Sequence, residues 1–187
     1  MFRIRSLPAA LAAVVAAALL TQAPIPPAAA QGAAGQNGAV GSNSGLPLPR
    51  FVSLKAAKVN SRIGPGSSYP VDWLYLKAGL PMEIIQEFDN WRRVRDADGA
   101  EGWVNQSLLS GKRTAIVAPW QRGKDAAVDL LAEPSREARK VALVQPGAVG
   151  SIRMCNGEWC QMTFSGHTGW ISQNLIWGAY PGETIKD

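Results

Sequence analysis

The two cysteines are the residues whose spacing is best suited to covalent chemistry. Cys155 and Cys160 bracket the segment Asn156-Gly-Glu-Trp159, which suggests a tight turn between two antiparallel strands. If Asn156-Gly157 forms a type I′ turn, the cysteines share a face but lie diagonally. If Gly157-Glu158 forms a type II′ turn, Cys155 lies opposite Cys160 in a non-hydrogen-bonded pair. The Cα atoms are then about 4.5 Å apart, within the range of a disulfide.

The sequence shows no other residue pattern typical of a catalytic or metal-binding site. His167 is the only histidine, in the turn Phe164-Ser-Gly-His-Thr-Gly169, and no motif places a cysteine, serine or carboxylate beside it. Acid–base catalysis needs such a partner, and a metal site needs more ligands at suitable spacing. We therefore expect no catalytic residue, no metal and no cofactor, and predict that the protein is not an enzyme.

The elements that position these residues occur twice. Residues 102–109 read Gly-Trp-Val-Asn-Gln-Ser-Leu-Leu, and residues 169–176 read Gly-Trp-Ile-Ser-Gln-Asn-Leu-Ile. Short stretches with apolar residues at alternate positions precede each copy, separated by turn residues. Residues 125–142 come nearest to a helical pattern, but Pro134 interrupts them and the repeat places a loop and a strand there. The pattern predicts an all-β protein made of two small barrels.

The repeat also selects between the two cysteine arrangements. Trp91 matches Trp159, so the turn Asp89-Asn90 matches Gly157-Glu158. Cys155 then lies opposite Cys160, and the equivalent pair in the first unit is Glu87 opposite Arg92. A redox centre of the Cys-x-x-Cys type needs a different spacing and a helix start. We expect a structural disulfide.

The first unit resembles the bacterial SH3-like domain family, and the whole layout is similar to a two-repeat exported subfamily. The resemblance rests on the stretch from Val59 to Val71, on Gly79, on Trp91-Arg-Arg-Val and on Gly99-Ala-Glu-Gly-Trp103-Val. The second unit departs from it, because Leu130-Leu-Ala-Glu-Pro-Ser135 replaces the Asn60-to-Gly66 stretch. The resemblance implies two tandem SH3-like barrels that bind peptidoglycan stem peptides. We expect the two barrels to pack together, because a single barrel of about 60 residues is only marginally stable.

Several residues of this pattern have expected roles. Gly64 and Gly66 can adopt positive φ around Pro65, which would fold the loop back on itself. Trp103 and Trp170 are expected to fill the two barrel cores. The side chains of Asn60 and Arg62 can either tie the loop down or bind a ligand. The candidate ligand-binding residues are Asn60, Arg62, Tyr69 and Trp91.

The chain ends and the charge balance suggest an exported protein. Residues 1–30 combine Arg3 and Arg5 with an apolar run and Ala28-Ala-Ala30, as in a cleavable signal peptide. An uncleaved anchor is the alternative, although the run is shorter than the roughly 20 residues that span a bilayer. Without Arg3 and Arg5 the net charge falls from +5 to +3, and the scattered charges argue against nucleic-acid binding. Among them, Arg93 and Arg95 share one strand face, which we interpret as a solvated face.

The expected organisation is a signal peptide (1–30), a flexible tether (31–50), a first SH3-like domain (51–112), a divergent second domain (113–180) and a tail (181–187). Such a protein would be periplasmic or secreted, with no stable membrane insertion after cleavage. The primary hypothesis is a non-catalytic module that contacts cell-wall peptide or an envelope protein. The alternative is a structural or regulatory protein that docks a partner through a sheet edge or the groove between domains.

Overall fold

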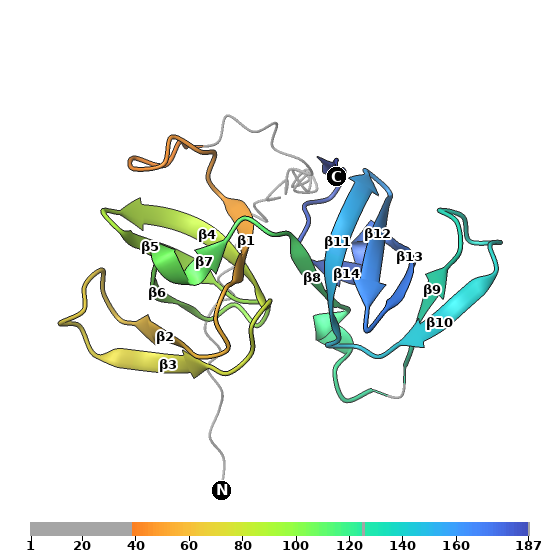
Figure 1. The fold of residues 1–187 in the computed structure, drawn as a ribbon, viewed down its shortest axis with the longest axis horizontal. Coiled ribbons are helices and arrows are strands. Elements are labelled where there is room, and N and C mark those ends of the chain that lie inside the picture. Colours follow the sequence, from red (N-terminus) through yellow and green to blue (C-terminus); the bar gives the residue numbers. More distant parts are fainter. Residues whose placement is uncertain (1–38, 125, 187) are drawn as a thin grey trace, which may run out of the picture. The chain divides into compact units, whose positions relative to one another are not determined.

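The computed structural model describes residues 39–124 and 126–186. The expected signal peptide, residues 1–30, and the first part of the expected tether, residues 31–38, lie outside this range. Within the described residues the chain forms strands and three short 3-10 turns, with no α-helix (Figure 1). The prediction of an all-β protein is confirmed. The same residues contain no helix that is long and apolar enough to cross a membrane.

Seven strands form the first sheet, in the order β3-β2-β6-β5-β4-β1-β7, with every neighbouring pair antiparallel. The 3-10 turn Gln106–Leu108 connects β6 to β7 along the chain. The strands are β1 (Arg50–Leu54), β2 (Val59–Arg62), β3 (Val71–Tyr75), β4 (Pro81–Phe88), β5 (Trp91–Arg95), β6 (Glu101–Asn105) and β7 (Leu109–Ser110).

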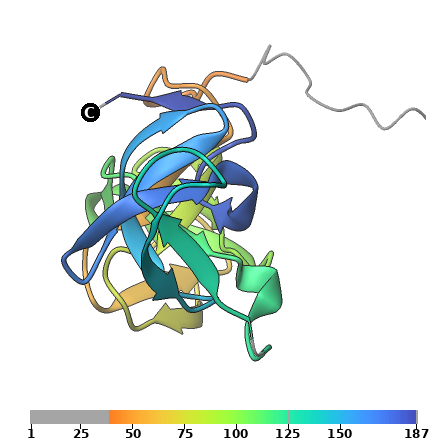
Figure 2. The same cartoon turned by 90° about the vertical axis from the view of Figure 1, so that its right-hand side faces the viewer.

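The second sheet repeats this order strand for strand, as β10-β9-β13-β12-β11-β8-β14, and β15 also pairs with β11. Figure 2 shows its strands in teal and blue. Residues 126–142 contain β9, a loop and the start of β10, as the repeat predicted in place of a helix. The strands are β8 (Thr114–Val117), β9 (Val128–Leu131), β10 (Lys140–Val144), β11 (Val149–Asn156), β12 (Trp159–Phe164), β13 (His167–Ser172), β14 (Ile176–Trp177) and β15 (Thr184–Ile185).

Each sheet encloses its own apolar core, as expected of two small barrels. Alternate strand residues point inward, so the period of two seen in the sequence becomes burial on one face. The first core contains Val52, Leu54, Val59, Tyr75, Met82, Ile84, Val94 and Val104. The second includes Val117, Leu130, Val144, Ile152, Met162, Phe164 and Ile171, together with both cysteines.

Trp103 and Trp170 do not fill these cores, and that prediction is wrong. Both tryptophans are only half-buried, whereas the next residues, Val104 and Ile171, are fully buried. The preceding glycine also faces inward, since a Cβ at Gly102 would lie 2.0 Å from the Ser61 hydroxyl oxygen. Because side chains alternate along a strand, the glycine and the aliphatic residue of each Gly-Trp-aliphatic triplet face the core, and the tryptophan faces outward.

The turn between β11 and β12 has the register that the repeat predicted. Cys155 lies opposite Cys160, with Cα atoms 4.1 Å apart, and the two sulfur atoms are bonded. Gly157 has a φ of +99°, on the side that the first central residue of a type II′ turn requires. In the first repeat, Glu87 lies opposite Arg92 and forms the ion pair expected at that position, at 3.3 Å.

Residues 39–50 were expected to belong to a flexible tether, but they are folded onto the first repeat. Val40 bridges to Pro47, the Gly41 N–H donates to the Leu46 carbonyl, and β1 already begins at Arg50. The expected tail is also held, because β15 pairs with β11 at Cys155 and Asn156. Composition suggested a flexible segment at residues 31–50, because hydrogen bonds to a carboxylate distant in sequence produce no periodic apolar pattern.

Contacts between the repeats surround Phe51. Its ring lies 5.0 Å from the ring of Trp177 and 4.7 Å from that of Tyr180, and the Arg113 guanidinium lies 5.7 Å from its centroid. The Tyr180 hydroxyl donates to Glu83 at 2.9 Å. Burial, and then the charge of Glu83, raise the pKa of Tyr180, so this hydroxyl keeps its proton. The expected packing of the two barrels is thus observed.

Candidate functional site

Three of the four predicted ligand-binding residues lie together in one hollow. Asn60, Arg62 and Trp91 line an open depression of about 420 Å³, whose volume suits a small ligand or a short peptide segment. We call this depression the first-repeat hollow. Its other lining residues are Lys58, Leu74, Asn105 and Leu108.

The sheet register brings these side chains to one place. Asn60 and Arg62 point outward from β2 because the alternate residues, Val59 and Ser61, are buried. Asn60 lies opposite Leu74 of β3, and Arg62 lies opposite Trp103 of β6. On the other side of β6, Asn105 lies opposite Trp91 of β5. The hollow is therefore formed by the outer face of four neighbouring strands.

The loop between β2 and β3 holds Arg62 in place. The Arg62 guanidinium donates to the carbonyl oxygen of Tyr69, and the Ile63 N–H donates to the Pro70 carbonyl. Tyr69 itself is exposed and does not line the hollow, so the structure separates it from the other three candidates. Its backbone, rather than its ring, contributes to the site by orienting the arginine.

Gly64 and Gly66 shape this loop in a different way from the one predicted. Neither has positive φ. A Cβ at Gly64 would instead lie 2.4 Å from Cδ1 of Tyr69, and one at Gly66 would lie 3.2 Å from Cδ2 of the same ring. The glycines are needed because the tyrosine ring packs against the loop backbone.

The electrostatics of the first-repeat hollow favour an anionic group. Lys58 and Arg62 contribute two cations, and Asn60 and Asn105 contribute amide groups that can donate or accept hydrogen bonds. Among the described residues, no acidic side chain lines the hollow. A carboxylate would gain charge-assisted hydrogen bonds here, while Trp91 and Leu74 offer apolar contact to the atoms beside it.

The neighbouring arginines are already paired. Arg93 and Arg95 share the outer face of β5, as expected, and both form ion pairs with Glu101 at 2.9 Å. Arg92 points to the opposite face and is 5% exposed. These three residues are therefore held by internal ion pairs, which leaves Lys58 and Arg62 as the cations of the site.

Sequence reasoning missed Lys58, Leu74 and Asn105 as members of the site. Lys58 could have been found, because it precedes Asn60 and Arg62 at the same two-residue interval and so shares their strand face. Leu74 and Asn105 depend on the pairing of β3 with β2 and of β6 with β5. That register is set by contacts distant in sequence, which no local pattern records.

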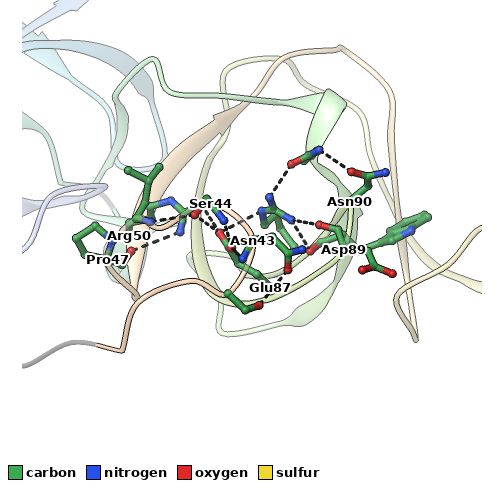
Figure 3. A network of polar contacts seen from close by, with 12 residues as sticks. Asn43, Ser44, Pro47, Arg50, Glu87, Asp89 and Asn90 are labelled. Atoms are coloured by element: carbon green, nitrogen blue, oxygen red, sulfur yellow. Dashed lines mark hydrogen bonds and ion pairs between the residues drawn. The ribbon is translucent and has the colours of Figure 1, made fainter.

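Glu87, near the C-terminal end of β4, is the most buried ionised carboxylate of the first repeat. Several hydrogen-bond donors surround it (Figure 3). Glu87 accepts hydrogen bonds from the N–H groups of Asn43 and Ser44 at 3.0 and 2.9 Å, from the Ser44 hydroxyl, and from Arg50 at 2.6 Å. Burial alone would raise its pKa, but the hydrogen bonds from Ser44, Arg50 and Asn43 outweigh burial and hold the pKa at about 2. Such a group anchors residues 39–50 and is not poised for proton transfer.

His167 is exposed at the start of β13, in the turn where the sequence predicted it. Over residues 39–124 and 126–186, no group of three or more histidine, cysteine or acidic residues is arranged to hold a metal ion.

Comparison with solved structures gives distant similarity. NlpC2 from Trichomonas vaginalis is 13% identical with a TM-score of 0.32, over 71% of this chain and 49% of that one. An NlpC/P60 family protein from Bacillus cereus ATCC 10987 is 11% identical with a TM-score of 0.31, over 68% of this chain and 56% of that one. This chain thus spans about half the length of the structures it matches.

Two further comparisons concern sequence. A search of curated proteins found no match. Residues 55–111 and 124–178 each match the family model described as the bacterial SH3 domain. The first matched segment contains β2 to β7 of the first sheet, and the second contains β9 to β14 of the second sheet.

Proposed function

The chain belongs to the bacterial SH3 domain family, and we propose that it is a non-catalytic, exported protein that binds cell-wall peptide through the first-repeat hollow. The observation that carries the proposal is the chemistry of this hollow: Lys58 and Arg62 face a shared depression with Trp91, and no acidic residue among the described ones lines it. Peptide stems of the wall carry free carboxylates, which these cations can bind.

The cysteines support an extracytoplasmic location. The Cys155–Cys160 disulfide is of the kind that persists in oxidising compartments. Together with the signal-like residues 1–30, it favours export and cleavage near Ala30. The intact mass of protein from the periplasmic fraction should then correspond to a chain that begins at or near Gln31. Recovery of the uncleaved chain in membranes would support the anchor instead.

Binding can be tested by co-sedimentation with purified sacculi and by calorimetry with a soluble stem peptide. Lys58→Gln removes one cation from the hollow, and we expect about tenfold weaker binding, the usual worth of one charge-assisted contact. Lys55→Gln is the matched control, since Lys55 is also exposed but lies outside the hollow. Equal affinities for the two variants, or no binding of either sacculi or peptide by the wild type, would contradict the proposal.

The second candidate function is docking of an envelope protein, and the outer strand of the first sheet favours it. Among residues 39–124 and 126–186, no strand pairs with the far side of β3, and its exposed residues include Val71, Trp73 and Leu74, with Trp73 60% exposed. An edge strand with such side chains can accept an added strand from a partner. Cross-linking in cells separates the candidates, because a single dominant protein adduct through β3 supports docking and muropeptide adducts support wall binding.

A further inference from the structure

The second repeat contains a hollow at the position equivalent to the first-repeat hollow. It has a volume of about 460 Å³ and is lined in part by Asp129, Arg136, Trp159, Ser172 and Asn174. A depression of about 350 Å³ adjoins it and shares Arg136, Trp159, Ser172 and Asn174. We call the two together the second-repeat hollow.

The sheet registers show that the two positions correspond. Trp159 lies opposite Ser172 as Trp91 lies opposite Asn105. Leu131 lies opposite Trp170 as Arg62 lies opposite Trp103. The hollow is therefore a feature of the repeated fold, although the sequence of the second repeat lacks the loop pattern of the first.

The second repeat keeps the tryptophan of the hollow but has different charged residues around it. Trp159 replaces Trp91, but the β9 residues at the places of Asn60 and Arg62 are Asp129 and Leu131. Asp129 is paired with Lys140 at 2.9 Å, which neutralises it. The remaining lining charges, Arg136 and Glu158, have opposite signs. The cationic character of the first-repeat hollow is thus absent from the second.

The polar groups that remain suit hydroxyl-rich ligands. Ser172 and Asn174 offer one hydroxyl and one amide beside Trp159, and Arg136 adds several N–H donors. Arg136 comes from the loop that replaces the Gly-Pro-Gly stretch of the first repeat, and that loop is held by hydrogen bonds such as the one from the Ala132 N–H to the Arg139 carbonyl. The divergent loop therefore supplies a side chain to this hollow.

We propose that the second-repeat hollow binds an uncharged saccharide. A pyranose ring presents an apolar C–H face that can pack on an indole ring, and a rim of hydroxyls that both donate and accept hydrogen bonds. Balanced lining charges favour such a ligand over a carboxylate or an amine, whose desolvation would need a net opposite charge. This site is separate from the first-repeat hollow, so it goes beyond the proposed function and does not depend on it.

The experiment is an NMR titration of the purified, isotope-labelled protein with the trisaccharide of N-acetylglucosamine and with maltotriose. We expect shifts of the Trp159 indole and of the Ser172 and Asn174 amides by at least one of them. Trp159→Ala should weaken saccharide binding about tenfold or more. Trp91→Ala, the equivalent change in the first repeat, should leave it unchanged. Asn174→Ala, at an exposed position of the 3-10 turn Gln173–Leu175, gives a milder test if Trp159→Ala impairs folding.

The outcomes are distinguishable from those of the proposed function. Failure of both saccharides to bind the wild type at about 10 mM would overturn the inference, whatever the peptide result. Loss of saccharide binding in Trp91→Ala but not in Trp159→Ala would also overturn it, because the sugar would then occupy the first-repeat hollow. A stem peptide that binds wild type and Trp159→Ala equally would leave the proposed function intact in either case.

Discussion

Glu87 illustrates how one side chain can organise residues far from it in sequence. Its carboxylate is inaccessible to solvent and contacts the cations of Arg50 and Arg92. Removing such a charge from water is unfavourable unless several donors replace the water. Residues 39–50 provide these donors, and their close fit is visible at Gly41, where a Cβ would lie 2.5 Å from the carboxylate carbon.

The ionisation of Glu87 should make stability depend on acid. Its folded-state pKa, about 2, lies below the ordinary 4.5. The stabilisation is therefore complete above about pH 4.5 and is lost as pH falls towards 2. At about 1.4 kcal/mol per pH unit between the two values, the loss is on the order of 3 kcal/mol. Urea titrations at several pH values should show this decline for the wild type.

Glu87→Gln should flatten that decline and lower the unfolding free energy at neutral pH by about 3 kcal/mol, because Arg50 and Arg92 lose their counter-charge. Asp98→Asn is the control, since it breaks an exposed ion pair with Arg122 and should cost less than about 1 kcal/mol. A wild-type decline that persists in Glu87→Gln would assign the acid sensitivity to another carboxylate.

The outward direction of Trp103 gives a second prediction at this scale. Val104→Ala removes buried methyl groups and should cost about 2–3 kcal/mol. Trp103→Ala removes a half-buried ring from the outer face and should cost less than Val104→Ala, despite the larger change in volume. Thermal or denaturant unfolding of the two variants decides the order, and a larger loss for Trp103→Ala would show that the ring supports the core.

The hairpin of β11 and β12 has a disulfide at the position where the equivalent hairpin of the first repeat, β4 and β5, has an ion pair. Freshly isolated protein should contain no free thiol, and reduction should lower stability by about 2 kcal/mol, because the closed loop is short. Replacing Cys155 by Glu and Cys160 by Arg copies the ion pair of the first repeat and should recover part of that loss. Calorimetry of oxidised, reduced and doubly substituted protein tests this, and two reactive thiols in the oxidised protein would contradict the bond itself.

Elements were predicted best where the repeat supplied a second copy of the same pattern. The register at Cys155 and Cys160 followed from aligning Trp91 with Trp159, and the strand-for-strand sheet order confirms the tandem architecture. The direction of Trp103 was predicted wrongly because residue type was weighed above strand alternation. Residues 39–50 were misjudged because their hydrogen bonds reach Glu87, about 40 positions away, and no local pattern encodes such a contact.

At the scale of the whole described chain, the same sheet appears twice with different sites on its outer face. The first-repeat hollow is cationic, and the second-repeat hollow is balanced in charge. If both are occupied by one polymer, the second contact forms at a high effective concentration, provided that the spacing of the two repeats is maintained. The contacts around Phe51 can maintain it, together with the exposed ion pair between Asp98 and Arg122.

Phe51 should therefore couple the unfolding of the two repeats. Each repeat alone is near the lower size limit for a stable core, so loss of their shared contacts should expose two separate transitions. Phe51→Ala removes the ring that Trp177 and Tyr180 contact, and calorimetry should then show two transitions where the wild type shows one. Tyr180→Phe, which removes only the hydrogen bond to Glu83, should keep a single transition and cost about 1 kcal/mol. A single transition in Phe51→Ala, coincident by heat capacity and by amide exchange in both sheets, would mean that other contacts join the repeats.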